Sequence, residues 1–162
     1  MRAMWMAVFA SALMFSGCGE QGKPVSPAKA KETKILGKDM FSLEVEDFKL
    51  TNAEVQKLEG AGGGKVVVFK DDYSRAEKTI QLGKGKYEVT VYALGPSFDE
   101  DAFYLTVGNL AEERRWPENP GELLPTQDTI SLTQEADGPC NITLRFGEKN
   151  VQLDRVQFKP VP

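Results

Sequence analysis

From residue 41 onward, apolar and polar residues alternate over many short stretches of the chain. The clearest stretch is 86–93, where Tyr87, Val89 and Val91 alternate with polar residues. A period of two is typical of a strand with one buried face. The pattern predicts strands over residues 42–48, 65–70, 77–82, 86–93, 102–108, 128–133, 140–146 and 152–158.

Turn-forming residues separate these stretches. Glycine dominates residues 60–64 and 83–85, and Gly or Pro also occurs at 95–96, 137–139 and 147–150. Such residues favour turns because glycine adopts left-handed backbone angles and proline fixes φ. Only residues 52–59 are compatible with a short helix. Many short strands at fairly regular spacing predict an all-β fold, an antiparallel β-sandwich of the jelly-roll type.

The first residues have a different character. Arg2 precedes the apolar run Met4–Phe15, which is shorter than the roughly 20 residues that cross a bilayer. Such a run is typical of a signal peptide. The next residues, Ser16-Gly17-Cys18, complete a sequence that resembles the lipobox of bacterial lipoproteins, with Phe15 where Leu is usual. We expect residues 1–17 to be a signal peptide and Cys18 to be the lipid-modified first residue of the mature protein.

Residues 18–39 contain Pro, Lys, Ser and Ala but almost no large apolar side chain. This composition predicts a flexible linker between the lipid anchor and a domain over residues 40–162. We therefore expect the protein in the cell envelope, attached to a membrane through Cys18. Gly19, in place of Asp, after the acceptor Cys favours the outer membrane if the host is Gram-negative.

Composition excludes several classes of function. The chain has no histidine, so Ser-His-Asp and Cys-His catalysis and His-ligated zinc are excluded. The net charge is −4 and no basic stripe occurs, so nucleic acid is not an expected partner. If Cys18 is acylated, Cys140 has no disulfide partner. We expect Cys140 to be a small buried apolar residue, because no basic neighbour is available to activate its thiol.

Three stretches, in this order, resemble carbohydrate-binding modules of families 6 and 35, which are galactose-binding-like jelly rolls. The stretches are Leu43–Phe48 (LEVEDF), Ile80–Val91 continuing into Asp101–Gly108 (DAFYLTVG), and Val151–Val156 (VQLDRV). They resemble the opening, middle and closing strand motifs of these families. Together they cover essentially all of residues 41–158.

The resemblance implies a structural calcium site at Glu44, Glu46 and Asp154. On a strand, Glu44 and Glu46 would project to one face, because side chains alternate with a period of two. In such jelly rolls the first and last strands are neighbours, which would bring Asp154 close. Three carboxylates near an apolar face need a cation, and calcium accepts many oxygen ligands with loose geometry. The alternative is a surface cluster neutralised by Arg155 or a lysine.

The resemblance also implies a sugar site with an aromatic platform. Trp116 lies roughly where the family places a ligand-stacking Trp, and Tyr73 lies in a loop where it often places a second aromatic. Gln152 stands where the family commonly has an Asn that hydrogen-bonds the sugar, and Asn150 is nearby. The alternatives are a hydrophobic plug for Trp116 and an ordinary loop residue for Tyr73.

Three functions are compatible with these observations. The leading hypothesis is a membrane-anchored, non-catalytic carbohydrate-binding lipoprotein whose partner is a polysaccharide or glycan. The second is a protein-interaction or structural module on the same fold, which the Gln152 departure favours. The third is a glycosidase or lyase using the acidic residues 71–72 or 99–101. We do not expect an enzyme, since adjacent carboxylates on an exposed loop rarely face each other across a cleft.

Overall fold

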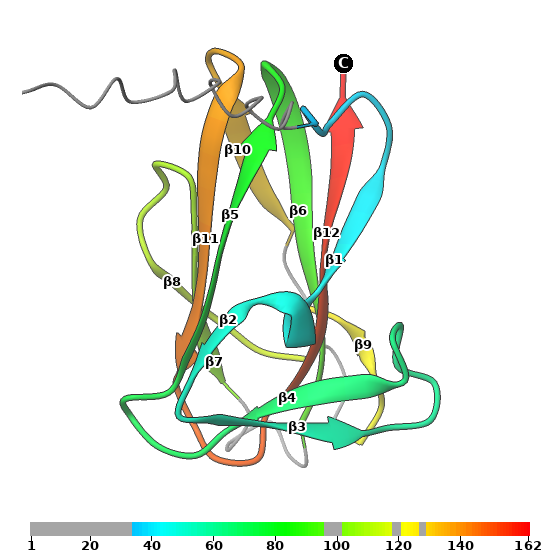
Figure 1. The fold of residues 1–162 in the computed structure, drawn as a ribbon, viewed down its shortest axis with the longest axis vertical. Coiled ribbons are helices and arrows are strands. Elements are labelled where there is room, and N and C mark those ends of the chain that lie inside the picture. The colour runs from blue at the N-terminus through cyan, green and yellow to red at the C-terminus, as the bar shows by residue number, and fades with distance from the viewer. Residues whose placement is uncertain (1–33, 96–101, 118–120, 127–128) are drawn as a thin grey trace, which may run out of the picture. The chain divides into compact units, whose positions relative to one another are not determined.

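The computed structural model describes residues 34–95, 102–117, 121–126 and 129–162. Its regular elements are antiparallel strands and one short 3-10 turn, arranged in two sheets (Figure 1). Within these ranges, no helix is long and apolar enough to cross a membrane. Cys18 lies outside the described residues.

The larger sheet contains the first and the last strand of the domain. Its order is β10-β6-β12-β4-β3, with β1 also paired to β12 and β9 also paired to β6. The bounds are β1 Phe41–Glu44, β3 Ala53–Lys57, β4 Lys65–Phe69, β6 Gly85–Leu94, β9 Leu124–Pro125, β10 Ile130–Gln134 and β12 Gln152–Val161. The predicted proximity of the first and last strands is confirmed, since Leu43 pairs with Val156.

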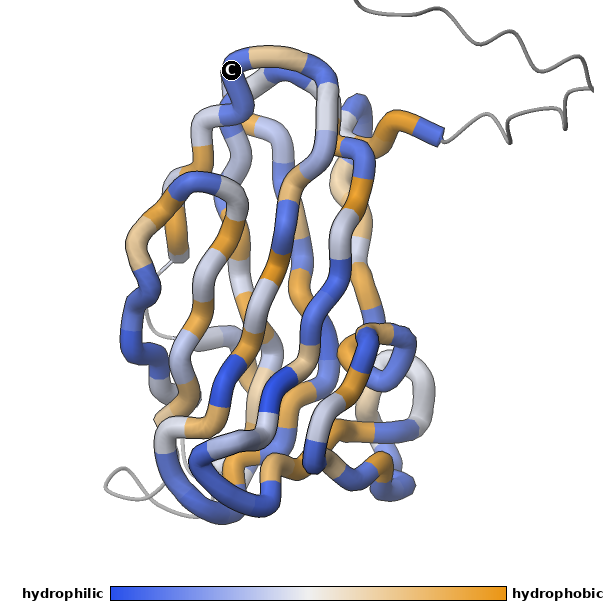
Figure 2. The backbone as a smooth tube through the Cα atoms, turned by 60° about the vertical axis from the view of Figure 1, so that its left-hand side comes forward, coloured by the Kyte–Doolittle hydropathy of each residue, from blue (hydrophilic) through white to orange (hydrophobic). Residues whose placement is uncertain are grey.

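The second sheet has the order β2-β5-β11-β7-β8. Its strands are β2 Lys49–Thr51, β5 Arg75–Leu82, β7 Phe103–Val107, β8 Glu113–Arg115 and β11 Gly138–Phe146. Alternate residues of the long strands in both sheets are buried between the layers, as the colours along the chain in Figure 2 indicate. The all-β, jelly-roll prediction is confirmed.

The core lies between the sheets. Tyr87, Val91 and Phe158 of the larger sheet and Leu105 and Leu144 of the smaller one are at most 2% exposed. Cys140 is fully buried in the same cluster, and burial raises the pKa of its thiol. The prediction that Cys140 is a buried apolar residue is confirmed.

The predicted strand over 42–48 is wrong in its second half. The chain forms β1 only to Glu44, turns through the 3-10 segment η1 (Val45–Asp47) and enters the other sheet as β2. Phe48 N–H donates to the Val45 carbonyl at 3.0 Å to close this turn. Corners of sandwiches are made where a strand changes sheets, and Val45, fully buried, anchors this corner.

Residues 52–59, which were compatible with a short helix, are not helical. Residues 53–57 form the edge strand β3, paired to β4 along its whole length, with Val55 opposite Val67. Ala, Glu, Gln and Lys favour helices locally, but pairing with β4 overrides that preference. A short, mostly exposed, polar edge strand of this kind discourages pairing with other molecules. The short strands β2, β8 and β9 were not predicted, because they carry too few residues for a period to be visible.

The segment 34–39, which we expected to belong to the linker, lies against the sandwich. Leu36 N–H donates to the Gln81 carbonyl, and Gly83 N–H donates to the Leu36 carbonyl, both at 2.8 Å. Contacts with the sandwich therefore include residues before 40, at the end of the domain that holds the β5–β6 turn.

Candidate functional site

Asp154 is buried at an irregularity in β12. The register with β6 shifts between Leu153 and Arg155, which makes Asp154 the extra residue of a β-bulge. A bulge re-aims a side chain relative to the regular alternation. As a result Leu153 and Asp154, adjacent in sequence, are both fully buried. The Asp154 carboxylate therefore lies next to η1 and the β3–β4 turn.

Glu44 and Glu46 both face the glycines of the β3–β4 turn. An added Cβ would lie 2.6 Å from Glu44 Oε2 at Gly62 and 2.3 Å from Glu46 Oε1 at Gly63. Gly62 N–H also donates to Asp154 Oδ1 at 2.8 Å. The glycine turn predicted from sequence therefore has a second role. Because Gly62 and Gly63 have no side chains, the three carboxylates can approach the backbone of the turn.

Strand alternation is not what brings the two glutamates together. Glu44 ends β1 and Glu46 lies in η1, so the expected shared strand face does not exist. The η1 turn instead carries Glu46 back toward Glu44. Glu44 and Glu46 are neighbours, as predicted, but the η1 turn brings them together and strand alternation does not.

The acidic cluster, which we define as Glu44, Glu46 and Asp154, is incompletely neutralised. Arg155 Nη1 donates to Asp154 Oδ2 at 2.5 Å, and the guanidinium lies 3.8 Å from the centre of the Tyr92 ring. One cation therefore faces three carboxylates. Burial, with the charges of Asp154 and Glu46, raises the pKa of Glu44 above its usual value, against a lowering influence of Arg155.

Two oxygens of the acidic cluster have no hydrogen-bond partner. Glu44 Oε2 and Glu46 Oε2 are both buried without one. Buried polar atoms are normally satisfied, and an unsatisfied carboxylate oxygen costs free energy. No group of three or more Asp, Glu, His or Cys side chains among the described residues already stands in metal-binding geometry. The donor set nevertheless fits a hard cation, because its free atoms are carboxylate oxygens next to backbone.

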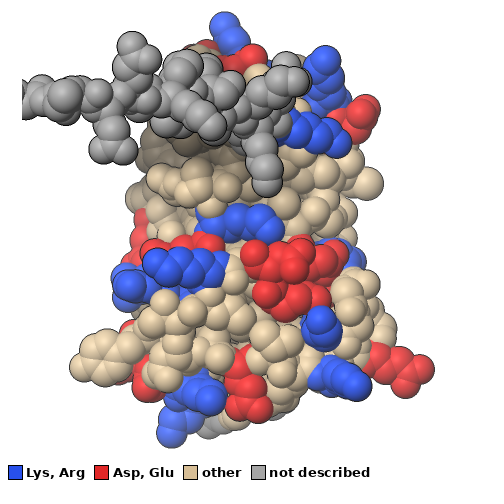
Figure 3. All heavy atoms as spheres, in the orientation of Figure 1, with Lys and Arg blue, Asp and Glu red and all other residues tan. Residues whose placement is uncertain are grey.

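Figure 3 shows acidic side chains gathered in the middle of one face, over η1, with basic side chains beside them. Asp47 contributes to the acidic content of η1 and is exposed, unlike the oxygens of the acidic cluster. The face as a whole carries both signs of charge.

The predicted sugar-binding aromatics lie at one end of the smaller sheet. Tyr73 precedes β5 and is 82% exposed, and Trp116 follows β8 and is 38% exposed. The strand order places two strands between β5 and β8, so the two side chains are about 14 Å apart at the usual strand spacing. They cannot stack on one sugar ring, but both are available to a longer ligand.

The buried plug considered for Trp116 does not fit its exposure, whereas Tyr73 lies in an exposed turn, where an ordinary loop residue would also lie. Trp116 is too exposed for a buried plug, and the Arg114 guanidinium lies 5.2 Å from its ring centre. Tyr73 lies in a turn fixed by Asp71 Oδ1, which accepts from Tyr73 N–H at 3.0 Å. The turn therefore presents the Tyr73 ring outward.

Gln152 and Asn150 take different positions. Gln152 belongs to β12, lies between Val68 and Leu94, and is partly buried. Asn150 is exposed in the preceding turn, with a left-handed φ of 70°. The hollow of about 380 Å³ that contains Tyr73 includes neither Gln152 nor Asn150.

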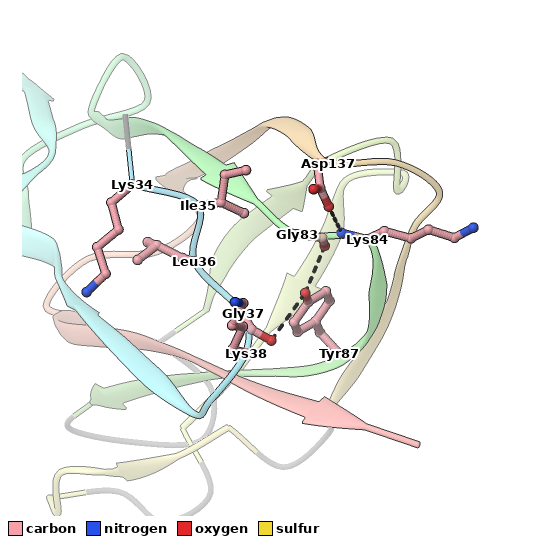
Figure 4. Close-up of a pocket in the computed structure, with 9 residues that line it drawn as sticks. All are labelled: Lys34, Ile35, Leu36, Gly37, Lys38, Gly83, Lys84, Tyr87 and Asp137. Carbon is pink, nitrogen blue, oxygen red and sulfur yellow. Dashed lines mark hydrogen bonds between the residues drawn. The ribbon is translucent and has the colours of Figure 1, made fainter. Parts of the chain in front are cut away.

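A larger hollow of about 700 Å³ lies at the opposite end of the sandwich (Figure 4). Two of its polar groups are engaged within the protein: the Tyr87 hydroxyl donates to the Gly83 carbonyl at 2.8 Å, and Lys84 N–H donates to Asp137 at 2.7 Å. The side chains of Lys34 and Lys84 point away from each other. Tyr87 is 2% exposed, so no aromatic face is offered to a sugar there.

No model of a protein family matches the chain, and no curated protein matches it. Solved structures do. A family 35 carbohydrate-binding module from Clostridium thermocellum superposes with a TM-score of 0.61 at 14% identity, covering 75% of this chain and 98% of that module. The family 35 module of Paenibacillus barcinonensis gives 0.59 at 19% identity, covering 75% and 99%.

The chain also matches part of larger enzymes. The Podospora anserina GH26-CBM35 β-(1,4)-mannanase gives a TM-score of 0.64 at 14% identity, covering 76% of this chain. This chain spans only 28% of that mannanase and 29% of the exo-β-1,3-galactanase of Phanerochaete chrysosporium. At these identities the likeness shows the fold. The chain therefore has a jelly-roll β-sandwich fold like that of the family 35 carbohydrate-binding modules.

Proposed function

We propose that this domain is a non-catalytic carbohydrate-binding module that a lipid on Cys18 anchors at the cell envelope. The observation that carries the proposal is the pair of exposed aromatic side chains, Tyr73 and Trp116, at one end of a sandwich with this fold. Exposed aromatic faces stack on the apolar faces of sugar rings while polar neighbours bind hydroxyls.

The acidic residues support a binding role over catalysis. Glycoside hydrolysis needs two carboxyl groups facing each other across a cleft, about 5–9 Å apart. Asp71 is engaged by its own turn, where it accepts from Tyr73 N–H and from the Asn52 side chain. In the acidic cluster, Asp154 is fully buried and pairs with Arg155, while Glu44 and Glu46 are partly buried. Residues 99–101 lie outside the described residues.

The positions of Leu36 and of the two exposed aromatic residues are compatible with a tethered module. Leu36 joins the sandwich at the β5–β6 turn, and Tyr73 and Trp116 lie at the other end of the strands. Strand β6 has ten residues, which corresponds to about 33 Å. A linker that attaches at the first end would leave the aromatic end free to meet a glycan. Replacing Cys18 by Ser should abolish lipid labelling and release the protein from the membrane fraction.

We further propose that the acidic cluster holds a structural calcium ion. Glu44 Oε2 and Glu46 Oε2 would ligate it, together with Asp154, and backbone carbonyls would complete the shell. When bound, the ion supplies positive charge that offsets the carboxylates. The support is the pair of buried, unpartnered oxygens beside Gly62 and Gly63.

Affinity electrophoresis and calorimetry with a panel of soluble polysaccharides test the binding proposal. We expect the wild-type domain to bind at least one polysaccharide and Trp116→Ala to weaken that binding. Met40→Ala is a matched control, because Met40 is a 60% exposed apolar side chain in a different part of the domain. Absence of binding to every polysaccharide, by a folded and calcium-loaded domain, would contradict the proposal.

A further inference from the structure

We propose that a neutral, extended oligosaccharide lies across the strands of the smaller sheet, on its outer face. This inference rests on the carbohydrate-binding function proposed above, and it adds the path and the charge class of the ligand. The path follows what we call the arginine row, to which each strand of the sheet contributes one residue: Thr51, Arg75, Arg145, Tyr104 and Arg114.

The strand register defines the row. Arg75 is directly opposite Arg145, Arg145 is opposite Tyr104, and Tyr104 is opposite Arg114. Directly opposite residues of antiparallel strands project from the same face of the sheet. The members from β5, β11, β7 and β8 face outward, because each has at least one buried neighbour in the sequence: Ala76, Leu144, Phe103, Leu105 and Arg115.

The row places two like charges next to each other. Arg75 and Arg145 form a directly opposed pair of like charges, and such a pair is unfavourable in a sheet. Their side chains remain about half exposed. Arg145 also lies 5.9 Å from the centre of the Tyr104 ring. The row therefore presents guanidinium groups and an aromatic ring on an open face, where a ligand can contact them.

The exposed aromatics border this row along one edge. Tyr73 lies two residues before Arg75, and Trp116 lies two residues after Arg114. Since β5 and β8 run in opposite directions, Tyr73 before β5 and Trp116 after β8 lie toward the same end of the sheet. A hollow of about 380 Å³ lies between Tyr73, Arg75 and Arg145. The row therefore has a hollow at the Tyr73 end and an aromatic ring at each end.

The charges of the row are balanced by carboxylates. Arg75 pairs with Glu77 at 3.3 Å and Arg145 with Glu112 at 3.0 Å. Arg114 pairs with Glu148. Three cations thus face three anions, and an anionic ligand would gain little net attraction. Hydroxyl groups suit such pairs, because they accept from guanidinium N–H groups and donate to carboxylate oxygens. The ligand is therefore an uncharged polyol chain long enough to span the three strand spacings from Arg75 to Arg114, about 14 Å.

Calorimetry with a soluble mannan, a galactan and a polygalacturonate tests the path and the charge class. Arg145→Ala should weaken binding of the neutral polysaccharide by about tenfold, the effect of losing one good contact. Asn141→Ala is the matched control, since Asn141 lies on the same strand and face but pairs with Thr79, away from the row. Arg145→Lys keeps the charge and loses the planar fork, so it should also weaken binding while preserving the fold.

The outcomes separate this inference from the broader proposal. Weaker binding in both Arg145 variants, with Asn141→Ala unchanged and little dependence on salt, supports the path. Wild-type binding that survives both Arg145 variants but is lost in Gln152→Ala overturns the path and leaves carbohydrate binding intact. Binding confined to polygalacturonate, with a steep loss in salt, overturns the neutral ligand. No binding at all by the wild-type domain overturns both.

Discussion

Replacing Glu46 by Gln tests the physical account of the acidic cluster. In the wild type, three carboxylates face one guanidinium, which leaves a formal charge of −2 (−3 + 1). Glu46→Gln keeps the shape of the side chain and reduces this to −1. The variant should therefore be more stable than the wild type without calcium and less responsive to calcium. If Glu46 made only a structural polar contact, its replacement would not raise stability without calcium and also reduce the response to calcium.

The magnitudes follow from the cluster. A buried polar oxygen without a partner costs roughly 1–3 kcal/mol, so relieving part of that cost should stabilise the calcium-free variant by about 1 kcal/mol. For a domain of about 130 residues this corresponds to a rise in Tm of roughly 4 °C. Calcium at a hundredfold excess over its Kd should stabilise the wild type by about 2.7 kcal/mol, or roughly 10 °C.

Differential scanning calorimetry in EDTA and in excess calcium measures both effects. Asp47→Asn is the matched control, because Asp47 lies in the same η1 turn but is exposed. Its Tm response to calcium should equal that of the wild type. If Glu46→Gln lowers the Tm in EDTA and leaves the calcium response unchanged, the acidic cluster is not a cation site and the charge reasoning is wrong.

Three further results are expected. In EDTA, the free energy of unfolding should fall as pH rises from below 4.5 through the raised pKa of Glu44, because the folded state holds that proton more tightly than the unfolded chain. Urea unfolding from pH 4 to 8 measures this free energy, and a rise over that range would contradict the expectation. Gly37→Ala should destabilise the domain by about 1–3 kcal/mol, since φ is +107° and the new Cβ would lie 2.3 Å from the Tyr87 hydroxyl; an unchanged urea midpoint would argue against this packing. Cys140 should react with a thiol reagent only after unfolding, because burial raises the pKa of its thiol, and rapid labelling of the native domain would refute that.

Much of the fold was accessible from sequence because the long strands have one buried face. The alternation around Tyr87, Val89 and Val91 predicted β6, and the glycine runs predicted turns that exist. The same reasoning failed at 45–47 and at 52–59. In both places local pattern or propensity was overridden by a change of sheet and by pairing with β4, which are long-range contacts.

For the site, the sequence by itself determined which residue types are present and, through the motif resemblance, that Glu44, Glu46 and Asp154 belong together. It also determined that histidine chemistry is absent. Only the tertiary structure decided how these carboxylates meet, through a bulge at Asp154 and the bare backbone of Gly62 and Gly63. The arginine row was likewise invisible in the sequence. Its members lie on five separate strands, and the register that aligns them is set by the packing of buried faces rather than by any local sequence pattern.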